Sequence, residues 1–79
     1  MEDDLRGSRY FMHLHNMVRS RRLHGLDTAS VSEGPLHRPM WTFTIAINGQ
    51  YFSATGLTKA QAREIAAMRA LYTFGFLDC

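Results

Sequence analysis

The chain has 79 residues, so we expect one small domain. Its formal net charge is +2. A hydrophobic content of 46% is ordinary for a globular protein and argues against disorder along the whole chain. The single cysteine, Cys79, excludes an internal disulfide and a cysteine-based zinc finger, and we expect an intracellular protein. No apolar run approaches the ~20 residues of a membrane helix, and the acidic first four residues are unlike a signal peptide.

The first expected element is a helix that begins near residue 9. Phe11, Leu14 and Val18 follow the i, i+3, i+7 spacing of one apolar helix face. Ser8 is the candidate N-cap, and residues 24–25, His-Gly, are expected to stop the helix or to follow it closely. Residues 1–8 are charged and lack apolar periodicity, so we interpret them as a flexible end.

Three strands are expected next. Residues 27–33 are small, polar and partly β-branched, which favours a weak edge strand, and Gly34-Pro35 indicates a turn. Residues 41–48 alternate strictly between apolar and polar side chains, which predicts a half-buried strand. Asn48-Gly49 then favours a type I′ turn, so a returning strand is expected from residue 50 to about residue 54.

The last expected element is a second helix. Thr58 and Gln61 have the spacing of a capping box, in which each side chain accepts a hydrogen bond from the other residue's amide. Alanines recur at every fourth position, which lets a helix lie close to a sheet: Ala62, Ala66 and Ala70. Gly75 is placed to end the helix.

This α-β-β-β-α order predicts an α+β fold, with a three-stranded antiparallel sheet and two helices packed on one face. We expect the domain to cover residues 9–76 and to leave residues 77–79 as a tail. Trp41 and Phe43 fall on the apolar face of the strongest strand, so we assign them to the core rather than to base stacking.

The residues do not indicate catalysis. His13 and His15 would point about 200° apart on a helix, so they cannot share a metal ion. His24 and His37 lie in expected loops, a glycine-rich phosphate loop is absent, and Ser, His and Asp follow no hydrolase motif. We therefore expect no enzyme activity, no metal, no cofactor and no small-molecule substrate.

Two segments carry a family resemblance. One is the Gly-Pro-Leu-His-Arg-Pro loop at residues 34–39, and the other is the helix start Thr-Lys-Ala-Gln-Ala-Arg at residues 58–63, with alanines behind it. Together with the aromatic-led strand between them, they resemble the double-stranded-RNA-binding domain family over roughly residues 9–74. The C-terminal half carries the specific motifs, whereas the first helix matches only in its apolar pattern.

The resemblance implies a module that recognises the shape of A-form RNA over about 16 base pairs, through two minor grooves and the phosphates between them. We expect RNA contacts from seven residues: Met12 and Asn16 in the first helix with Arg19 one turn on, His37 in the Gly-Pro loop with Arg38 within reach of a phosphate, and Lys59 and Arg63 at the start of the last helix. Phosphate is also favoured at a helix N-terminus by the free amides and the macrodipole.

The sequence departs from the family at two of these regions. Asn16 stands where the family usually has Glu, and Ala60 stands at the middle basic position of the last helix. The missing cation predicts modest or partner-assisted RNA binding. Residues 48–52 and 70–74 are similar to the binding domains of RNA-editing adenosine deaminases, but the zinc motif of the deaminase is absent.

A second function class stays open. An apolar stripe on the outer face of the last helix, continued by the tail, predicts a homodimer or a protein partner: Ile65, Met68, Tyr72, Phe76 and Leu77. Scattered surface hydrophobic residues are the plain alternative. Likewise, the cluster of Arg19, Arg21 and Arg22 fits a solvated helix face as well as an RNA contact.

Overall fold

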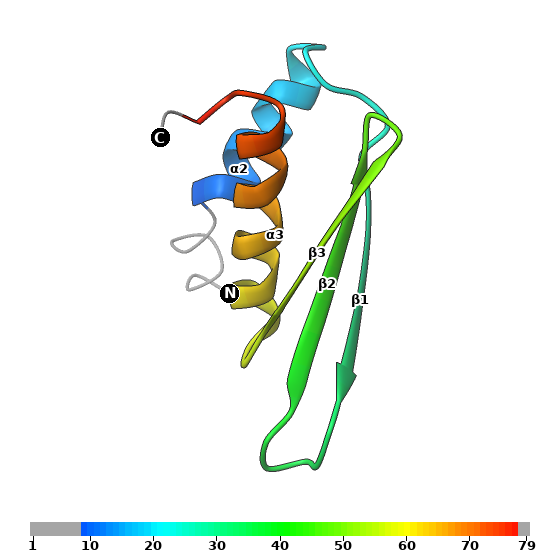
Figure 1. Cartoon of the computed structure of the whole chain (residues 1–79), viewed down its shortest axis with the longest axis vertical. Coiled ribbons are helices and arrows are strands. Elements are labelled where there is room, and N and C mark those ends of the chain that lie inside the picture. Colours follow the sequence, from blue (N-terminus) through cyan, green and yellow to red (C-terminus); the bar gives the residue numbers. More distant parts are fainter. Residues whose placement is uncertain (1–8, 78–79) are drawn as a thin grey trace.

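A computed structural model of the chain describes residues 9–77. Its elements are α2 (Arg9–Arg19), β1 (Asp27–Glu33), β2 (Met40–Ile47), β3 (Gln50–Gly56) and α3 (Lys59–Thr73). The strands form one antiparallel sheet in the order β1-β2-β3, and both helices lie on the same side of it (Figure 1). The predicted α+β fold is confirmed. The flexible end at residues 1–8 and the Ser8 cap lie outside the described residues, as does most of the expected tail.

The core lies between α3 and the two strands β2 and β3. Its buried residues come from three places. The apolar face of the sheet contributes Phe43, Ile45, Ile47 and Ala54, and one face of α3 contributes Ala62, Ala66, Ala67, Ala70 and Leu71. Leu14 of α2 and Leu23 beyond it complete the core. Alanines let the α3 backbone lie close to the strands, as their spacing predicted. In the described part of the chain, no helix is long and apolar enough to span a membrane.

The edge strand β1 is built differently from β2 and β3. All seven of its residues are exposed. The register places three hydroxyl residues opposite core-facing residues of β2: Thr28 opposite Ile45, Ser30 opposite Phe43, and Ser32 opposite Trp41. Directly paired residues share a face, so these hydroxyls face the helix side, while Ala29 and Val31 face outward. The expected edge strand is therefore confirmed, with its polar side toward the helices.

The β2–β3 hairpin turns at the predicted residues. Asn48 has φ 52° and Gly49 has φ 77°, the left-handed values that a type I′ turn needs. The Asn48 amide donates to the His24 carbonyl, and the His24 amide donates to Asn48 Oδ1, both at 2.8 Å. The hairpin tip is thus tied to the segment that follows α2.

Helix α2 ends without glycine. Arg21 takes the left-handed conformation, with φ 66°. The Arg22 amide donates to the Met17 carbonyl at 2.9 Å, and the Arg21 amide donates to the Val18 carbonyl at 3.0 Å. These two bonds form a Schellman motif, which satisfies carbonyls that the helix end would leave unpaired. The helix therefore stops before the expected His-Gly pair, which only follows it.

Candidate nucleic-acid interface

The outer face of α2 presents the first predicted region to solvent. Met12, Asn16 and Arg19 are all exposed, Met12 at 47%. They lie four and three residues apart, so they share one face, and Leu14 on the opposite face is fully buried. The structure thus brings these three side chains together as the sequence predicted.

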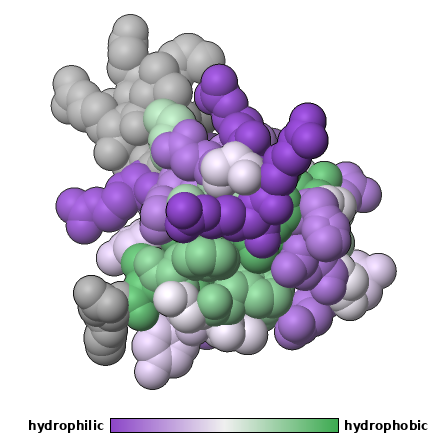
Figure 2. All heavy atoms as spheres, turned by 90° about the horizontal axis from the view of Figure 1, so that it is seen from above, coloured by the Kyte–Doolittle hydropathy of each residue, from purple (hydrophilic) through white to green (hydrophobic). Residues whose placement is uncertain are grey.

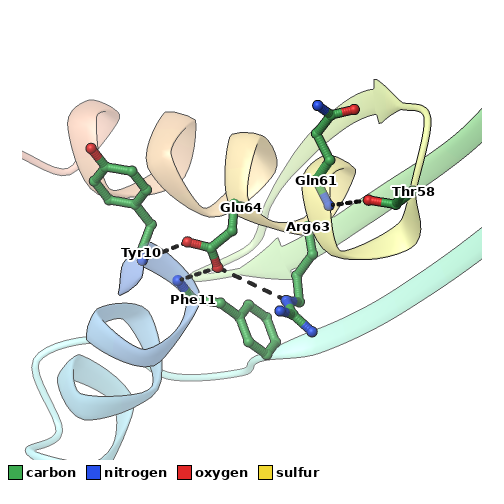
Figure 3. Close-up of polar contacts among 6 residues, drawn as sticks. All are labelled: Tyr10, Phe11, Thr58, Gln61, Arg63 and Glu64. Carbon is green, nitrogen blue, oxygen red and sulfur yellow. Dashed lines mark hydrogen bonds and ion pairs between the residues drawn. The ribbon is translucent and has the colours of Figure 1, made fainter. Parts of the chain in front are cut away.

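The start of α2 is capped by a residue of α3. The Tyr10 amide donates to Glu64 Oε1 at 2.8 Å, and the Phe11 amide donates to Glu64 Oε2 at 3.2 Å (Figure 3). The first amides of a helix lack partners within it, and a carboxylate there also complements the helix macrodipole. Glu64 therefore fixes where α2 begins relative to α3. Sequence reasoning missed this contact, because no local pattern signals a cap from more than 50 residues away.

The second predicted region is the loop between β1 and β2, at the lower end of the molecule in Figure 1. The Arg38 amide donates to the Pro35 carbonyl at 3.0 Å, which closes a turn. Gly34 has φ 97°, and a Cβ there would lie 3.1 Å from the Arg38 carbonyl oxygen, so the turn favours glycine on both counts. Leu36, His37 and Arg38 are exposed. The turn therefore presents the two predicted contact residues to solvent.

The third predicted region begins at the N-cap of α3. The Gln61 amide donates to Thr58 Oγ1 at 3.0 Å, as expected. The predicted partner of the Gln61 side chain was wrong by one residue, since its Oε1 accepts from the Leu57 amide at 2.8 Å. A Cβ on Gly56 would lie 2.9 Å from Gln61 Oε1, so this glycine permits the close approach of β3 to the helix start. This arrangement leaves Lys59, the first helical residue, exposed.

Arg63 differs from Lys59. Only 14% of the Arg63 side chain is exposed, and Nε lies 3.9 Å from Glu64 Oε2. The guanidinium carbon lies 5.2 Å from the centre of the Phe11 ring, within cation–π range. Figure 3 shows the Arg63 side chain beside that ring. The expected basic face is therefore divided, because α2 covers one of its two cations.

A shallow hollow of about 300 Å³ lies between α2, β1 and the start of α3. Its described lining consists of two cations, two hydroxyl residues, two phenyl rings and one alanine: Lys59, Arg63, Thr28, Ser30, Phe11, Phe43 and Ala29. We call it the β1 hollow. It arises because the helix-facing side chains of β1 are too short to fill the space beside the Phe11 ring.

The predicted protein-interaction stripe is only partly exposed. Met68 and Tyr72 are 37% and 63% exposed, whereas Ile65, Phe76 and Leu77 are partly buried against the core. The last two fold back because Gly75 ends α3, as predicted, with φ 82°, and the Phe76 amide donates to the Leu71 carbonyl at 2.8 Å. Figure 2 looks onto this end of the molecule and shows hydrophobic atoms gathered among hydrophilic ones. The five residues therefore do not form one exposed stripe.

Within residues 9–77, no three His, Cys, Asp or Glu side chains lie close enough together to hold a metal ion. The predicted contact residues of the three regions instead offer cations, one amide and one imidazole. Such groups suit phosphates and ribose hydroxyls better than a metal.

Comparison with known proteins identifies the fold. No family model matches the chain. It is similar to the two domains of DRB4 with their linker, with a TM-score of 0.72 and 25% identity over 90% of this chain and 47% of that one. A single DRB4 domain, dsRBD2, gives a TM-score of 0.67 and 27% identity over 84% of this chain and 94% of that one. In fold and in sequence the chain is similar to double-stranded-RNA-binding domains. Arabidopsis HYL1, at 22% identity, shares the fold, with a TM-score of 0.75 over 85% of this chain and 97% of that one.

The chain is also similar in sequence to part of two curated proteins. The chain is 41% identical over 51 residues to Double-stranded RNA-specific editase B2 of Mus musculus and of Rattus norvegicus. The match covers 63% of this chain but only 7% of each editase. Since the similar solved structures are binding domains and the editase match is confined to this short segment, the chain is a binding module rather than an enzyme.

Proposed function

We propose that this domain recognises the shape of A-form double-stranded RNA through minor-groove and phosphate contacts, with modest affinity. Similarity to double-stranded-RNA-binding domains supports double-stranded-RNA binding as such. The contact residues and the affinity are our proposal, and they rest on the exposure and placement of the three regions.

The arrangement of the regions supports a single extended contact surface. The β1–β2 loop lies at one end of the long axis, the start of α3 lies toward that end, and α2 runs toward the other (Figure 1). The longest dimension of the molecule is 40 Å. A surface of this length can reach two successive minor grooves and the phosphates between them, which is how such domains read a duplex.

Each region carries suitable chemistry. The Asn16 amide can both donate to and accept from a ribose 2′-hydroxyl, and Arg19 one turn away can pair with a phosphate. The His37 ring, on its glycine-proline turn, is proposed to enter the second minor groove, with Arg38 on the adjoining phosphate. Lys59 adds a cation at the start of α3, where the free amides already favour phosphate.

Modest affinity follows from the start of α3. Ala60 supplies no cation, and Arg63 is held against Phe11 and Glu64 with little of its side chain exposed. Lys59 is therefore the one fully presented cation among the three family positions on this described helix. The observation that carries the proposal is the joint exposure of the α2 face, the β1–β2 loop and Lys59 on a domain of this fold.

The proposal is tested by competition between an RNA duplex of about 20 base pairs and the DNA duplex of matching sequence. We expect RNA to compete better, because only RNA presents 2′-hydroxyls in a wide minor groove. Three neutralised phosphates, at Arg19, Arg38 and Lys59, should weaken binding by about 40-fold between 50 and 200 mM salt. Equal competition by the two duplexes would refute recognition of A-form shape.

A matched pair of variants checks the surface. Lys59→Ala should weaken RNA binding and reduce the salt slope by about one. Arg69→Ala is the control, because Arg69 is a cation of the same helix whose Nη1 donates to the Ser53 carbonyl of β3, away from the proposed surface. Equal losses in the two variants would mean that RNA responds to net charge and not to this surface.

A further inference from the structure

The β1 hollow is an unusual feature for a small domain. The helix-facing side of an edge strand normally carries apolar residues that complete the core, because interiors pack to high density. Here Thr28 and Ser30 take those positions opposite Ile45 and Phe43, and both are exposed. The outward face instead receives Ala29 and Val31. The hydroxyls are therefore accessible beside the aromatic rings.

The charge of the hollow has one sign. Lys59 and Arg63 both line it, and none of its described lining residues carries a carboxylate. Glu64 lies beside Arg63, but its two oxygens are engaged by the first amides of α2. Glu64 brings one negative charge against the two cations, so it offsets only part of the positive charge. Figure 3 shows Arg63 and Phe11 side by side, near the ribbon of β1.

We propose that the β1 hollow binds a nucleoside 5′-monophosphate group, either as a free mononucleotide or as the phosphorylated 5′ end of an RNA strand. A phosphate monoester carries about −1.5 to −2 charges and three acceptor oxygens, which suits the exposed Lys59, while the largely buried Arg63 adds positive charge to the wall of the hollow. The hollow, at about 300 Å³, lies at the small end of ligand sites and leaves room for more than a bare anion.

The rest of the lining fits the nucleoside. The Thr28 and Ser30 hydroxyls can each donate to or accept from a sugar or base. The Phe11 and Phe43 rings, 6.0 Å apart and edge to face, give the wall an apolar part. The first source of the ligand, a free nucleotide, does not rest on the proposed function, although Lys59 belongs to both surfaces. The second source rests on the proposed function, since it places an RNA end beside the duplex-binding surface.

The test titrates the domain with adenosine 5′-monophosphate, adenosine and inorganic phosphate, and follows backbone amide shifts by NMR. We expect saturable binding of the monophosphate, with shifts at β1 and at the start of α3, and weaker binding of the other two ligands. A Thr28→Val, Ser30→Ala double variant keeps the shape but removes both hydroxyls, and it should bind about tenfold more weakly. Ser53→Ala, on the outer face of the sheet, is the control and should bind as the wild type does.

Two results would overturn the proposal. One is the absence of saturable binding of the monophosphate. The other is equal binding of inorganic phosphate and monophosphate, with no effect of the double variant, because that pattern describes a general cation effect. Thr28 and Ser30 are exposed, so the double variant is expected to fold, and circular dichroism verifies this.

A second set of titrations identifies the source and separates the two proposals. If strand ends are the source, a 5′-phosphorylated RNA duplex binds more tightly than its 5′-hydroxyl counterpart, and the double variant loses the difference. Equal binding of the two duplexes, together with monophosphate binding, assigns the site to free nucleotide. The 5′-hydroxyl duplex alone tests duplex recognition, so its failure to bind would refute the proposed function and leave the mononucleotide site standing.

Discussion

The two halves of this domain differ in how completely their side chains are buried. Around α3, β2 and β3 the structure is closed, with alanines of the helix against Phe43, Ile45 and Ile47 of the sheet. Around β1 and the outer face of α2 it is open, with an exposed edge strand, a hydroxyl-lined hollow and a helix whose start is capped from α3. The difference indicates that the closed half supplies most of the folding free energy, whereas the open half holds the groups that can meet a ligand.

The largest expected effect on stability comes from a substitution in the closed half. Ile45 is fully buried in β2, so Ile45→Ala should lower the free energy of unfolding by about 2–5 kcal/mol through lost burial and a cavity. Thr44→Ala, its neighbour on the outer face, should cost far less. Urea unfolding followed by circular dichroism measures both. Similar losses for the two variants would contradict the assignment of stability to the closed half.

The contact between the two halves, at Glu64, should have the next largest effect on stability. Glu64→Ala removes both acceptors at the start of α2 and should cost about 0.5–2 kcal/mol, the range for loss of a helix cap. Glu64→Gln keeps one acceptor oxygen and should lose less. Hydrogen exchange of the α2 amides in the two variants checks the cause. If α2 protection stays at the wild-type level in Glu64→Ala, the cap does not hold the helix.

A smaller, stabilising change is available at the end of α2. Arg21→Gly removes the steric cost of a left-handed side chain, which exceeds the added flexibility of glycine in the unfolded chain. We expect a gain of about 0.5–1 kcal/mol in the same urea experiment. Gly25→Ala is a contrasting variant, because its φ of 75° should make it destabilising. A loss of stability in Arg21→Gly would show that the arginine side chain has a compensating role.

The smallest effect on stability should accompany a gain in binding. Ala60→Lys places a cation one residue from Lys59 in the first turn of α3, and lysine is a good helix former. Stability should change by less than about 0.5 kcal/mol. RNA binding should tighten, and its salt slope should steepen by about one. An unchanged slope would mean that position 60 does not face the phosphates.

Patterns that act over a few residues made most of the fold predictable. Three of these patterns predicted the structure that is observed: the alternation along β2, the Asn48-Gly49 turn and the alanine spacing of α3. The β3 strand runs two residues past its expected end, to Gly56, where it meets the helix start.

The features that the sequence did not predict depend on contacts between residues that are distant along the chain. Periodicity showed that α3 has a second apolar face, but it did not show that chain reversal after Gly75 would fold Phe76 back toward the core. The spacing of Lys59 and Arg63 put them on one helix face, but only the packing of α2 on α3 determined that Phe11 would cover one of them.

We propose that RNA contacts the open surface formed by α2, the β1–β2 loop and the start of α3. This proposal is tested most directly by recording backbone amide shifts of the labelled domain as an RNA duplex of about 20 base pairs is added. We expect the shifts to concentrate at Asn16, His37 and Lys59, while Thr42 and Thr44 on the outer face of the sheet stay at their free positions. Shifts centred on the outer face of the sheet, with those three residues unchanged, would contradict the account.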